Sequence, residues 1–426
     1  MVKFTKYLCD PIILAAMLSA LMLYSGTVKA KGSAEFSSLL QKDRIISISG
    51  TLCSDAVKKS GADFYKARLF SRTSRDAAGN SSTCRGCVEV YIPACMAEAY
   101  MPGKLYTEDS GKINFVCESG ESIELYGKFS QNGVFYVDRG KRIAFDKKNK
   151  KQMQILSAIL RFRSTCRMNF RRIMYSWNDA GGLFLALLSG IREYAEEDLC
   201  NAFRKSGLSH ILALSGMHLS LFSTLIASIA GKFCSKKVTA AFQIVAVLTF
   251  VWFAGISPSL FRALLCSLIC AFCSLAGLIS IKMIKILALA FLIHITVRSQ
   301  DIFDIAFMLS YGALSGILIF GEFATAIISR KIPFFISNAI GTSSGAQSFT
   351  APVSISKTGA FAPAGIIASV IISPMISVFI YSGIILLIVC FIFPDFVPAA
   401  AFFMKILYTI IKRTVLIFSL IPNLTF

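Results

Sequence analysis

Long apolar runs constrain this chain more than any other feature. They recur through most of the sequence after Gly181, and several approach the roughly 20 residues that a helix needs to cross a bilayer. Of the 426 residues, 55% are hydrophobic and only 16% are charged. Mean hydropathy is +0.65, which exceeds what a water-soluble globular protein can bury. The sequence therefore predicts a polytopic α-helical membrane protein.

The membrane part is predicted to occupy residues 179–426. It begins with a short buried helix to about Ile191 and an amphipathic helix at residues 196–205. The predicted spans then follow at residues 207–231, 238–256, 259–279, 284–297, 305–328, 364–393 and 400–421. Residues 332–363 contain three prolines and many small polar residues, a pattern typical of a broken or re-entrant segment. The basic loops at 232–237, 282–285 and 330–331 are predicted to be cytoplasmic.

The segment before this membrane part has a different pattern. Residues 1–30 carry Lys3 and Lys6 ahead of an apolar run, which is typical of either a signal peptide or an uncleaved anchor. Both alternatives place the next domain outside the cytoplasm. Residues 31–151 then alternate between apolar and polar positions, which predicts strands at 45–52, 64–70, 88–92, 123–129 and 134–138. Five strands of this size favour a small extracytoplasmic all-β domain with an OB-like fold.

The surface of this β-domain leaves two interpretations open. OB-like folds commonly bind oligonucleotides, and exposed tyrosines and arginines are suited to stack on bases and contact phosphates. An unspecialised β-sheet surface carries the same residue types and is the simpler interpretation. The domain also holds five cysteines, an odd number, which favours disulfides or free thiols over a zinc site: Cys53, Cys84, Cys87, Cys95 and Cys117.

A basic helix is predicted to join the two parts, at residues 152–178. Arginines interrupt its apolar residues too often for a lipid-facing span, so the pattern favours an amphipathic helix at the membrane interface. The interrupting residues are Arg161, Arg163, Arg167, Arg171 and Arg172. Such a helix holds the β-domain against the membrane or presents its arginines to a polyanion. The formal net charge of +20 has a similar ambiguity, because cationic residues bind nucleic acids and anionic lipids but also fix membrane topology.

Polar residues inside apolar segments are costly and usually face the interior of a helix bundle or an aqueous path. His210, Ser215 and His218 lie in one such segment, and on a continuous helix the two histidines share a face. A metal site needs more ligands than these. Ser215, His218 and Asp304 have the residue types of a hydrolytic trio, but no nucleophile-elbow motif surrounds the serine. A structural or pore-lining role is the preferred interpretation, with no metal, cofactor or catalytic residue.

Three stretches resemble motifs of the ComEC-type competence family. Residues 201–219, NAFRKSGLSHILALSGMHL, are similar to its pattern Phe-x-x-x-Gly-x-x-His-x-x-Ala-x-Ser-Gly-x-His. Residues 255–263, GISPSLFRA, are similar to Gly-x-x-x-Pro-x-x-Arg-Ala. Residues 301–311, DIFDIAFMLSY, are similar to a third element that starts with Asp-Pro and ends with Leu-Ser-Phe. The resemblance covers residues 181–387 and implies nine pore or motif residues: His210, Ser215, Gly216, His218, Arg262, Asp301, Asp304, Ser310 and Tyr311.

The resemblance implies a multi-pass channel in the bacterial inner membrane that takes up single-stranded DNA during natural transformation. The partners it implies are single-stranded DNA, membrane lipid, a DNA receptor, a separate nuclease and a cytoplasmic helicase or single-strand-binding protein. Two departures from the family pattern exist. Ile302 and Ala306 stand where the family usually has Pro and Gly, and no metallo-β-lactamase-like nuclease domain is found, so no nuclease activity is expected. The alternatives are a membrane-embedded hydrolase that uses Ser215 and His218, and a membrane-anchored module that binds nucleic acid.

Overall fold

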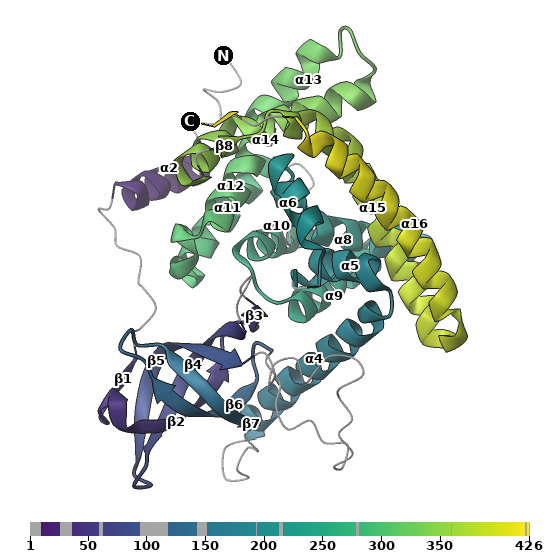
Figure 1. The fold of residues 1–426 in the computed structure, drawn as a ribbon. Coiled ribbons are helices and arrows are strands. Elements are labelled where there is room, and N and C mark those ends of the chain that lie inside the picture. Colours follow the sequence, from purple (N-terminus) through teal and green to yellow (C-terminus); the bar gives the residue numbers. More distant parts are fainter. Residues whose placement is uncertain are drawn as a thin grey trace. The chain divides into compact units, whose positions relative to one another are not determined.

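The computed structural model describes two compact units, one of which holds a β-barrel and the other a set of mostly apolar helices (Figure 1). The first unit spans Ser33–Ser176, and the second combines Met1–Gly32 with Trp177–Phe426. Within these units the described residues are 10–25, 36–58, 63–93, 118–142, 151–192, 194–212, 216–277, 281–358, 360–421 and 424–425. Each unit is considered by itself below.

The β-barrel is built from five main strands, at the positions that the sequence predicts. They are β2 (Ile45–Leu52), β4 (Phe64–Asp76), β5 (Ser81–Pro93), β6 (Ser122–Phe129) and β7 (Phe135–Arg142), with the short strands β1 (Ser37–Ser38) and β3 (Val57–Lys58) at their edges. The pairing order β5-β7-β6-β2-β4, together with a β4–β5 pairing, closes the sheet on itself. All pairs are antiparallel except β5–β7. Closure gives every main strand a paired neighbour on both sides, although β5 and β7 pair only at Val90–Phe135 and Tyr91–Tyr136.

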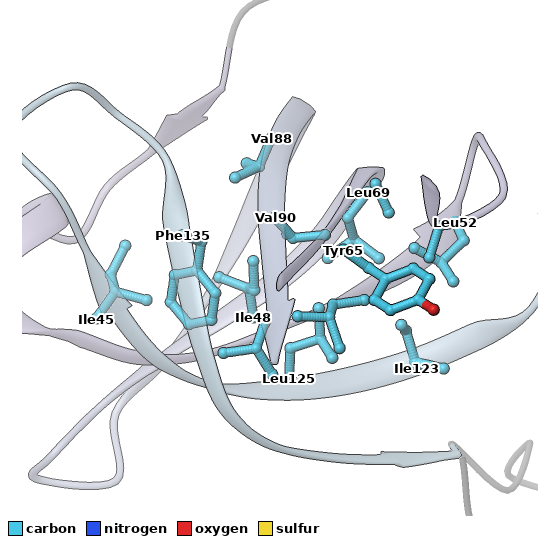
Figure 2. Close-up of a cluster of buried hydrophobic side chains, with 14 residues drawn as sticks. Ile45, Ile48, Leu52, Tyr65, Leu69, Val88, Val90, Ile123, Leu125 and Phe135 are labelled. Carbon is cyan, nitrogen blue, oxygen red and sulfur yellow. The ribbon is translucent and has the colours of Figure 1, made fainter. Parts of the chain in front are cut away.

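Every second side chain along the strands points inward, and these side chains fill the barrel. On β4, Tyr65, Ala67 and Leu69 point inward and are at most 4% exposed, and they join apolar side chains from the other main strands (Figure 2). The sheet bends where Gly50 and Gly127 interrupt the register. A Cβ atom on either glycine would lie within 2.0 Å of a carbonyl oxygen on the neighbouring strand. These two bulges therefore require glycine, and they give the curvature that a small barrel needs.

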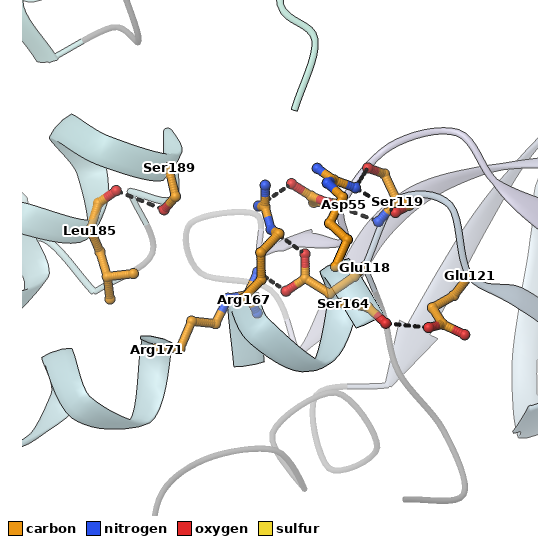
Figure 3. A network of polar contacts seen from close by, with 10 residues as sticks. Asp55, Glu118, Ser119, Glu121, Ser164, Arg167, Arg171, Leu185 and Ser189 are labelled. Atoms are coloured by element: carbon orange, nitrogen blue, oxygen red, sulfur yellow. Dashed lines mark hydrogen bonds and ion pairs between the residues drawn. The ribbon is translucent and has the colours of Figure 1, made fainter. Parts of the chain in front are cut away.

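The arginine-rich helix α4 (Lys151–Tyr175) belongs to the barrel unit. Arg167 is 1% exposed, and its guanidinium contacts Asp55 Oδ2 at 2.6 Å and Glu118 Oε2 at 2.8 Å (Figure 3). Arg171 contacts the other oxygen of Glu118 at 2.8 Å. Arg163 donates to the carbonyl oxygen of Ser119 at 2.7 Å. These three arginines thus face carboxylates and a carbonyl of the barrel unit rather than an external polyanion.

Burial and charge act in opposite directions on the two carboxyl groups of this network. Burial raises the pKa of Asp55, but the guanidinium of Arg167 and a hydrogen bond from the Ser119 amide lower it, and the net result lies below the usual value. Burial raises the pKa of Glu118, which is 2% exposed, and Arg171 and Arg167 oppose that rise. The network fixes α4 on the barrel through Arg167 and Glu118, which are buried, and through Asp55 and Arg171, which are partly exposed.

The described cysteines of the barrel unit are free thiols: Cys53, Cys84 and Cys87 in the barrel and Cys166 on α4. Burial and the neighbouring Cys87 thiol raise the pKa of Cys53 to about 11. Cys95 and Cys117 lie outside the described residues. Whether the five cysteines at positions 53–117 form disulfides or stay free thiols therefore stays a prediction.

The second unit is helical, and four of its helical segments are long and apolar enough to cross a membrane: Lys236–Ala254, Pro258–Leu275, Ile305–Ile328 and Ala364–Ile392. Shorter apolar helices are α2 (Pro11–Tyr24), α8 (Gly216–Ala230) and α11 (Met283–Val297). The remaining helices named below are α5 (Asn178–Ser189), α6 (Glu197–Lys205), α7 (Ser209–Leu212), α9 (Lys236–Ala254), α10 (Pro258–Leu275), α12 (Ile305–Gly316), α13 (Glu322–Ile328), α14 (Phe334–Thr358), α15 (Ala364–Ile392) and α16 (Val397–Ser419). The unit agrees with the predicted membrane protein.

One prediction is corrected in part. Residues 334–358 form the continuous helix α14 and not a broken segment, and the alternative of a re-entrant segment stays a prediction. Pro333 precedes this helix and Pro363 caps α15, so two of the three prolines occupy helix ends, where their fixed φ angle is tolerated. Only Pro352 lies inside the helix. The small residues that looked like loop formers instead allow close helix packing.

That packing joins α14 to α12 and to the π-helical turn η4 (Ile317–Gly321). A Cβ atom on Gly316 would lie 2.0 Å from the carbonyl oxygen of Gly345. A Cβ on Gly341 would lie 2.1 Å from Thr325 Oγ1. Backbones that meet this closely need glycine on both sides, as small residues commonly provide in membrane helix pairs.

The N-terminal helix α2 packs against α11 in the same unit. Ile13 and Ala16 form an apolar cluster with Ala288, and Asp10 pairs with Lys285. The Asp10 side chain also caps α2 by accepting from the amide of Ile12. These contacts attach α2 to α11 within the helical unit.

Candidate functional site

A buried polar cluster lies where α11 turns into α12. His294 is 0% exposed, and its two ring nitrogens lie 3.2 Å from the Tyr311 hydroxyl and 3.1 Å from Asp301 Oδ2. Arg298 reaches both oxygens of the same carboxylate, with Nε 3.0 Å from Oδ2 and Nη2 3.2 Å from Oδ1. Asp301 therefore accepts from an imidazole and a guanidinium at once.

Local structure explains how these groups meet. His294 and Arg298 are one helical turn apart at the end of α11, and the 3₁₀ helix η3 (Ser299–Phe303) then folds Asp301 back toward them. Tyr311 comes from two turns into α12. The rings of Phe261 and Phe307 pack edge-on against the imidazole, with centroids 4.8 and 4.9 Å away. These rings cover the imidazole, whereas the Arg298 side chain of the same cluster is 33% exposed.

Arg262 extends from α10 toward the start of α8. A Cβ atom on Gly216 would lie 2.8 Å from Arg262 Nη2 and 3.1 Å from the Cβ of Ala263. The buried Nε of Arg262 has no hydrogen-bond partner among the described residues. Gly216 thus leaves the space in which this guanidinium lies.

The two motif histidines lie on two described segments, α7 (Ser209–Leu212) and α8 (Gly216–Ala230). His210 is exposed, whereas His218 is only 1% exposed. The residues that join these segments lie outside the described part of the chain, so the projection of both histidines to one side stays a prediction. Ser215 lies between the two helices, outside the described residues.

The remaining predicted residues have local roles. Asp304 is exposed and caps α12, since its Oδ1 accepts from the amide of Ala306 at 2.8 Å. Ser310 is half-buried on α12. The structure brings Asp301 and Tyr311 together through His294. The sequence motifs do not include His294 and Arg298. Their i, i+4 spacing at the end of an apolar run nevertheless indicates that the two side chains lie close together.

The family model of the competence proteins matches residues 187–426, and this range includes α8, α10, the Asp301 cluster and Gly216. The chain belongs to the competence protein family. No curated protein and no solved structure is significantly similar to the chain. Membership in the ComEC/Rec2 competence family, together with the four apolar helices long enough to cross a membrane, indicates a membrane protein with a role in DNA uptake for transformation.

The barrel carries a second candidate site on its outer surface. Arg72 and Arg85 are both exposed and line a cavity of about 670 Å³, together with Phe70 and residues of β1. Elsewhere on the barrel, Phe64 and Tyr91 stack with centroids 4.4 Å apart, and the half-exposed Tyr136 meets Tyr91 edge-on at 5.3 Å. Cationic and aromatic side chains of this kind are the contacts that single-stranded nucleic acids use.

Proposed function

We propose that this protein is an inner-membrane channel that takes up single-stranded DNA during natural transformation, with the OB-like barrel outside the cytoplasm. The competence family match over residues 187–426 carries this proposal. The buried guanidinium of Arg262 supports it, because an arginine without a hydrogen-bond partner at its Nε suits a passing phosphate. In this proposal the Asp301 cluster holds α11 and α12 in place around the path and does not touch the strand.

The experiment is a transformation assay in the native organism with the deletion strain and with Arg262→Gln. We expect the deletion to reduce transformation by purified DNA to background. We expect Arg262→Gln to lower uptake at least tenfold with normal protein levels in the membrane. A deletion strain that integrates naked DNA as efficiently as wild type would refute the channel.

The proposed activity is transport without hydrolysis by this chain. Ser215→Ala separates that proposal from a membrane-embedded hydrolase that uses Ser215 and His218. For a channel, the serine hydroxyl contributes hydrogen bonds only, so uptake changes in degree. For a hydrolase, a measurable turnover disappears entirely.

A second candidate function is nucleic-acid binding by the barrel itself, and the Arg72–Arg85 cavity favours it. Its test is the affinity of the purified full chain for a labelled single-stranded oligonucleotide at several salt concentrations. Each phosphate contact contributes about −0.7 to the slope of log K against log salt for single strands. Replacing Arg72 and Arg85 by alanine should therefore flatten the slope by roughly 1.4.

The matched control for this test removes two cations that do not line the cavity. Lys128 and Arg139 are exposed on β6 and β7 of the same barrel. Their double alanine variant should keep the wild-type slope if the cavity is the site. Equal flattening in both variants would point to diffuse attraction by the basic surface and against a defined site.

A further inference from the structure

A cavity of about 800 Å³ lies between the start of α5 and one face of α16. It is separate from the Asp301 cluster and from the motif residues. Its lining includes three cationic side chains of α16, namely Lys405, Lys412 and Arg413. The spacing i, i+7, i+8 places all three on the same side of the helix. A cavity of this size with three cations on one wall can hold an anionic group.

The three cations differ in what they already contact. Lys412 binds both oxygens of Glu196, and the Tyr408 hydroxyl donates to the same carboxylate. Lys412 therefore belongs to the contact between α16 and the residues that begin α6. Lys405 and Arg413 are exposed, and neither contacts a carboxylate in the part of the chain that the structure describes. These two charges are available to a ligand.

The opposite wall adds hydrogen-bond donors. Trp177 lines the cavity and is 1% exposed, yet its indole N–H has no hydrogen-bond partner among the described residues. Trp177 is also the N-cap of α5, and Asn178 after it has φ of 51°. Backbone amides at such a helix start point outward and favour an anion. Asp179 also lines the cavity and is the one carboxylate on this wall, so the ligand belongs nearer to α16.

The rim of the cavity is apolar. Phe402 and Leu416 line it and are 68% and 37% exposed. Other large apolar side chains on α16 are also exposed, including Phe403, Ile410 and Ile417. A nucleic acid or a free phosphate would leave these side chains uncovered. A molecule that carries a phosphate and long acyl chains would cover the apolar rim and neutralise the cations at the same time.

We propose that the cavity between α5 and α16 binds an anionic phospholipid, with its phosphate held by Lys405 and Arg413 and its acyl chains lying along Phe402 and Leu416. Basic pockets beside membrane helices bind anionic headgroups in the same way. The proposal does not depend on DNA uptake, because none of these residues is among the nine pore or motif residues that the competence resemblance implies.

The test measures lipid retained by the purified full chain in detergent after incubation with phosphatidylglycerol or phosphatidylcholine, quantified by native mass spectrometry. We expect the wild type to retain phosphatidylglycerol in preference to phosphatidylcholine. The variant K405Q/R413Q should lose roughly 25-fold in phosphatidylglycerol affinity, since each cation near a headgroup contributes about fivefold. Lys412 is left intact so that its contact with Glu196 survives.

The matched control is K236Q/K237Q, which removes two exposed lysines at the start of α9. We expect this variant to bind phosphatidylglycerol like the wild type. Equal loss in both variants, or equal retention of the two lipids by the wild type, would overturn the proposal. So would displacement of the lipid by inorganic phosphate or by a single-stranded oligonucleotide at micromolar concentration, because the site would then recognise the phosphate alone.

Discussion

Asp301 is the residue on which the buried polar cluster depends. It is 7% exposed and accepts from both His294 and Arg298. Asp301→Asn removes the charge and leaves the guanidinium without its partner inside the helix unit. Breaking a buried ion pair from one side costs on the order of 3 kcal/mol. We expect a corresponding loss in the free energy of unfolding, measured by denaturant titration of the purified protein in mild detergent.

Asp304 offers the control three residues away. It is exposed and caps α12, and asparagine caps a helix about as well as aspartate does. Asp304→Asn should change the free energy of unfolding by no more than roughly 0.5 kcal/mol. Similar losses in the two variants would mean that the cluster around Asp301 adds nothing beyond local helix structure.

Individual site residues were predictable only where a motif marked them. Asp301 and Tyr311 stand in a motif, so the sequence indicated both. His294 is separated from them by the turn that η3 makes, and its partners depend on how that turn folds back. Helical periodicity predicts that His210 and His218 share a face, but it did not indicate that His218 alone is buried.

The contact between α12 and α14 depends on two facing glycines. Gly345→Ala would place a Cβ 2.8 Å from the carbonyl oxygen of Gly316 and from the amide nitrogen of Gly321. Backbone atoms cannot move aside as a flexible side chain can, so the helices must separate. Overpacking of this kind costs about 1–3 kcal/mol. We expect a lower midpoint of thermal unfolding. The midpoint is measured by size-exclusion chromatography of samples heated to increasing temperatures.

Gly312 on α12 provides the comparison. A Cβ at this position would meet its nearest atoms in α14 at 3.7 Å, which is ordinary van der Waals contact. Gly312→Ala should leave the midpoint unchanged or raise it slightly, because alanine favours the helix. If Gly312→Ala lowers the midpoint as much as Gly345→Ala does, close backbone approach is not the reason why the contact between α12 and α14 requires glycine.

Helix α4 is held on the barrel by Arg167. Arg167→Leu leaves Asp55 and Glu118 buried beside each other without their shared cation, at a cost of about 3–5 kcal/mol. We expect faster hydrogen exchange of the barrel amides at neutral pH, measured by mass spectrometry on the full chain. The exposed Arg139 is the control, and Arg139→Leu should leave exchange nearly unchanged.

The ion pair between Arg167 and Asp55 also predicts how the stability of the barrel unit depends on pH. The pKa of Asp55 is lowered in the folded protein, so the stability that its charge contributes is present above its unfolded value of about 3.9 and is lost as the pH falls below it. The difference in exchange between wild type and Arg167→Leu should therefore shrink below about pH 4. A difference that grows with acidity would contradict this assignment.

Elements were more predictable than their contacts. The five main strands appear where alternation predicts them, because each strand has one face in the barrel core. The arginines of α4 were read as groups for a membrane interface or a polyanion, since the acidic partners Asp55 and Glu118 lie far away in the sequence. In α14, small residues indicate a loop when taken alone and a close helix contact when the partner glycines are known.

The chain as a whole combines a β-barrel unit with a helical unit whose basic loops are predicted to be cytoplasmic. The barrel follows an apolar helix with a positive N-terminal flank, so we expect it on the opposite side. Two single cysteines in a cysteine-free version of the full chain test this: Asn132→Cys in the β6–β7 turn and Lys236→Cys at the start of α9. Both native side chains are exposed.

A membrane-impermeant maleimide added to intact spheroplasts should label the cysteine at position 132 and not the one at position 236. After the membrane is permeabilised, both should react, which shows that each thiol is accessible. Labelling of position 236 before permeabilisation, with position 132 protected, would invert the topology. The barrel would then face the cytoplasm, where it would meet a DNA strand only after transport, and the proposed position of the barrel outside the cytoplasm would be refuted.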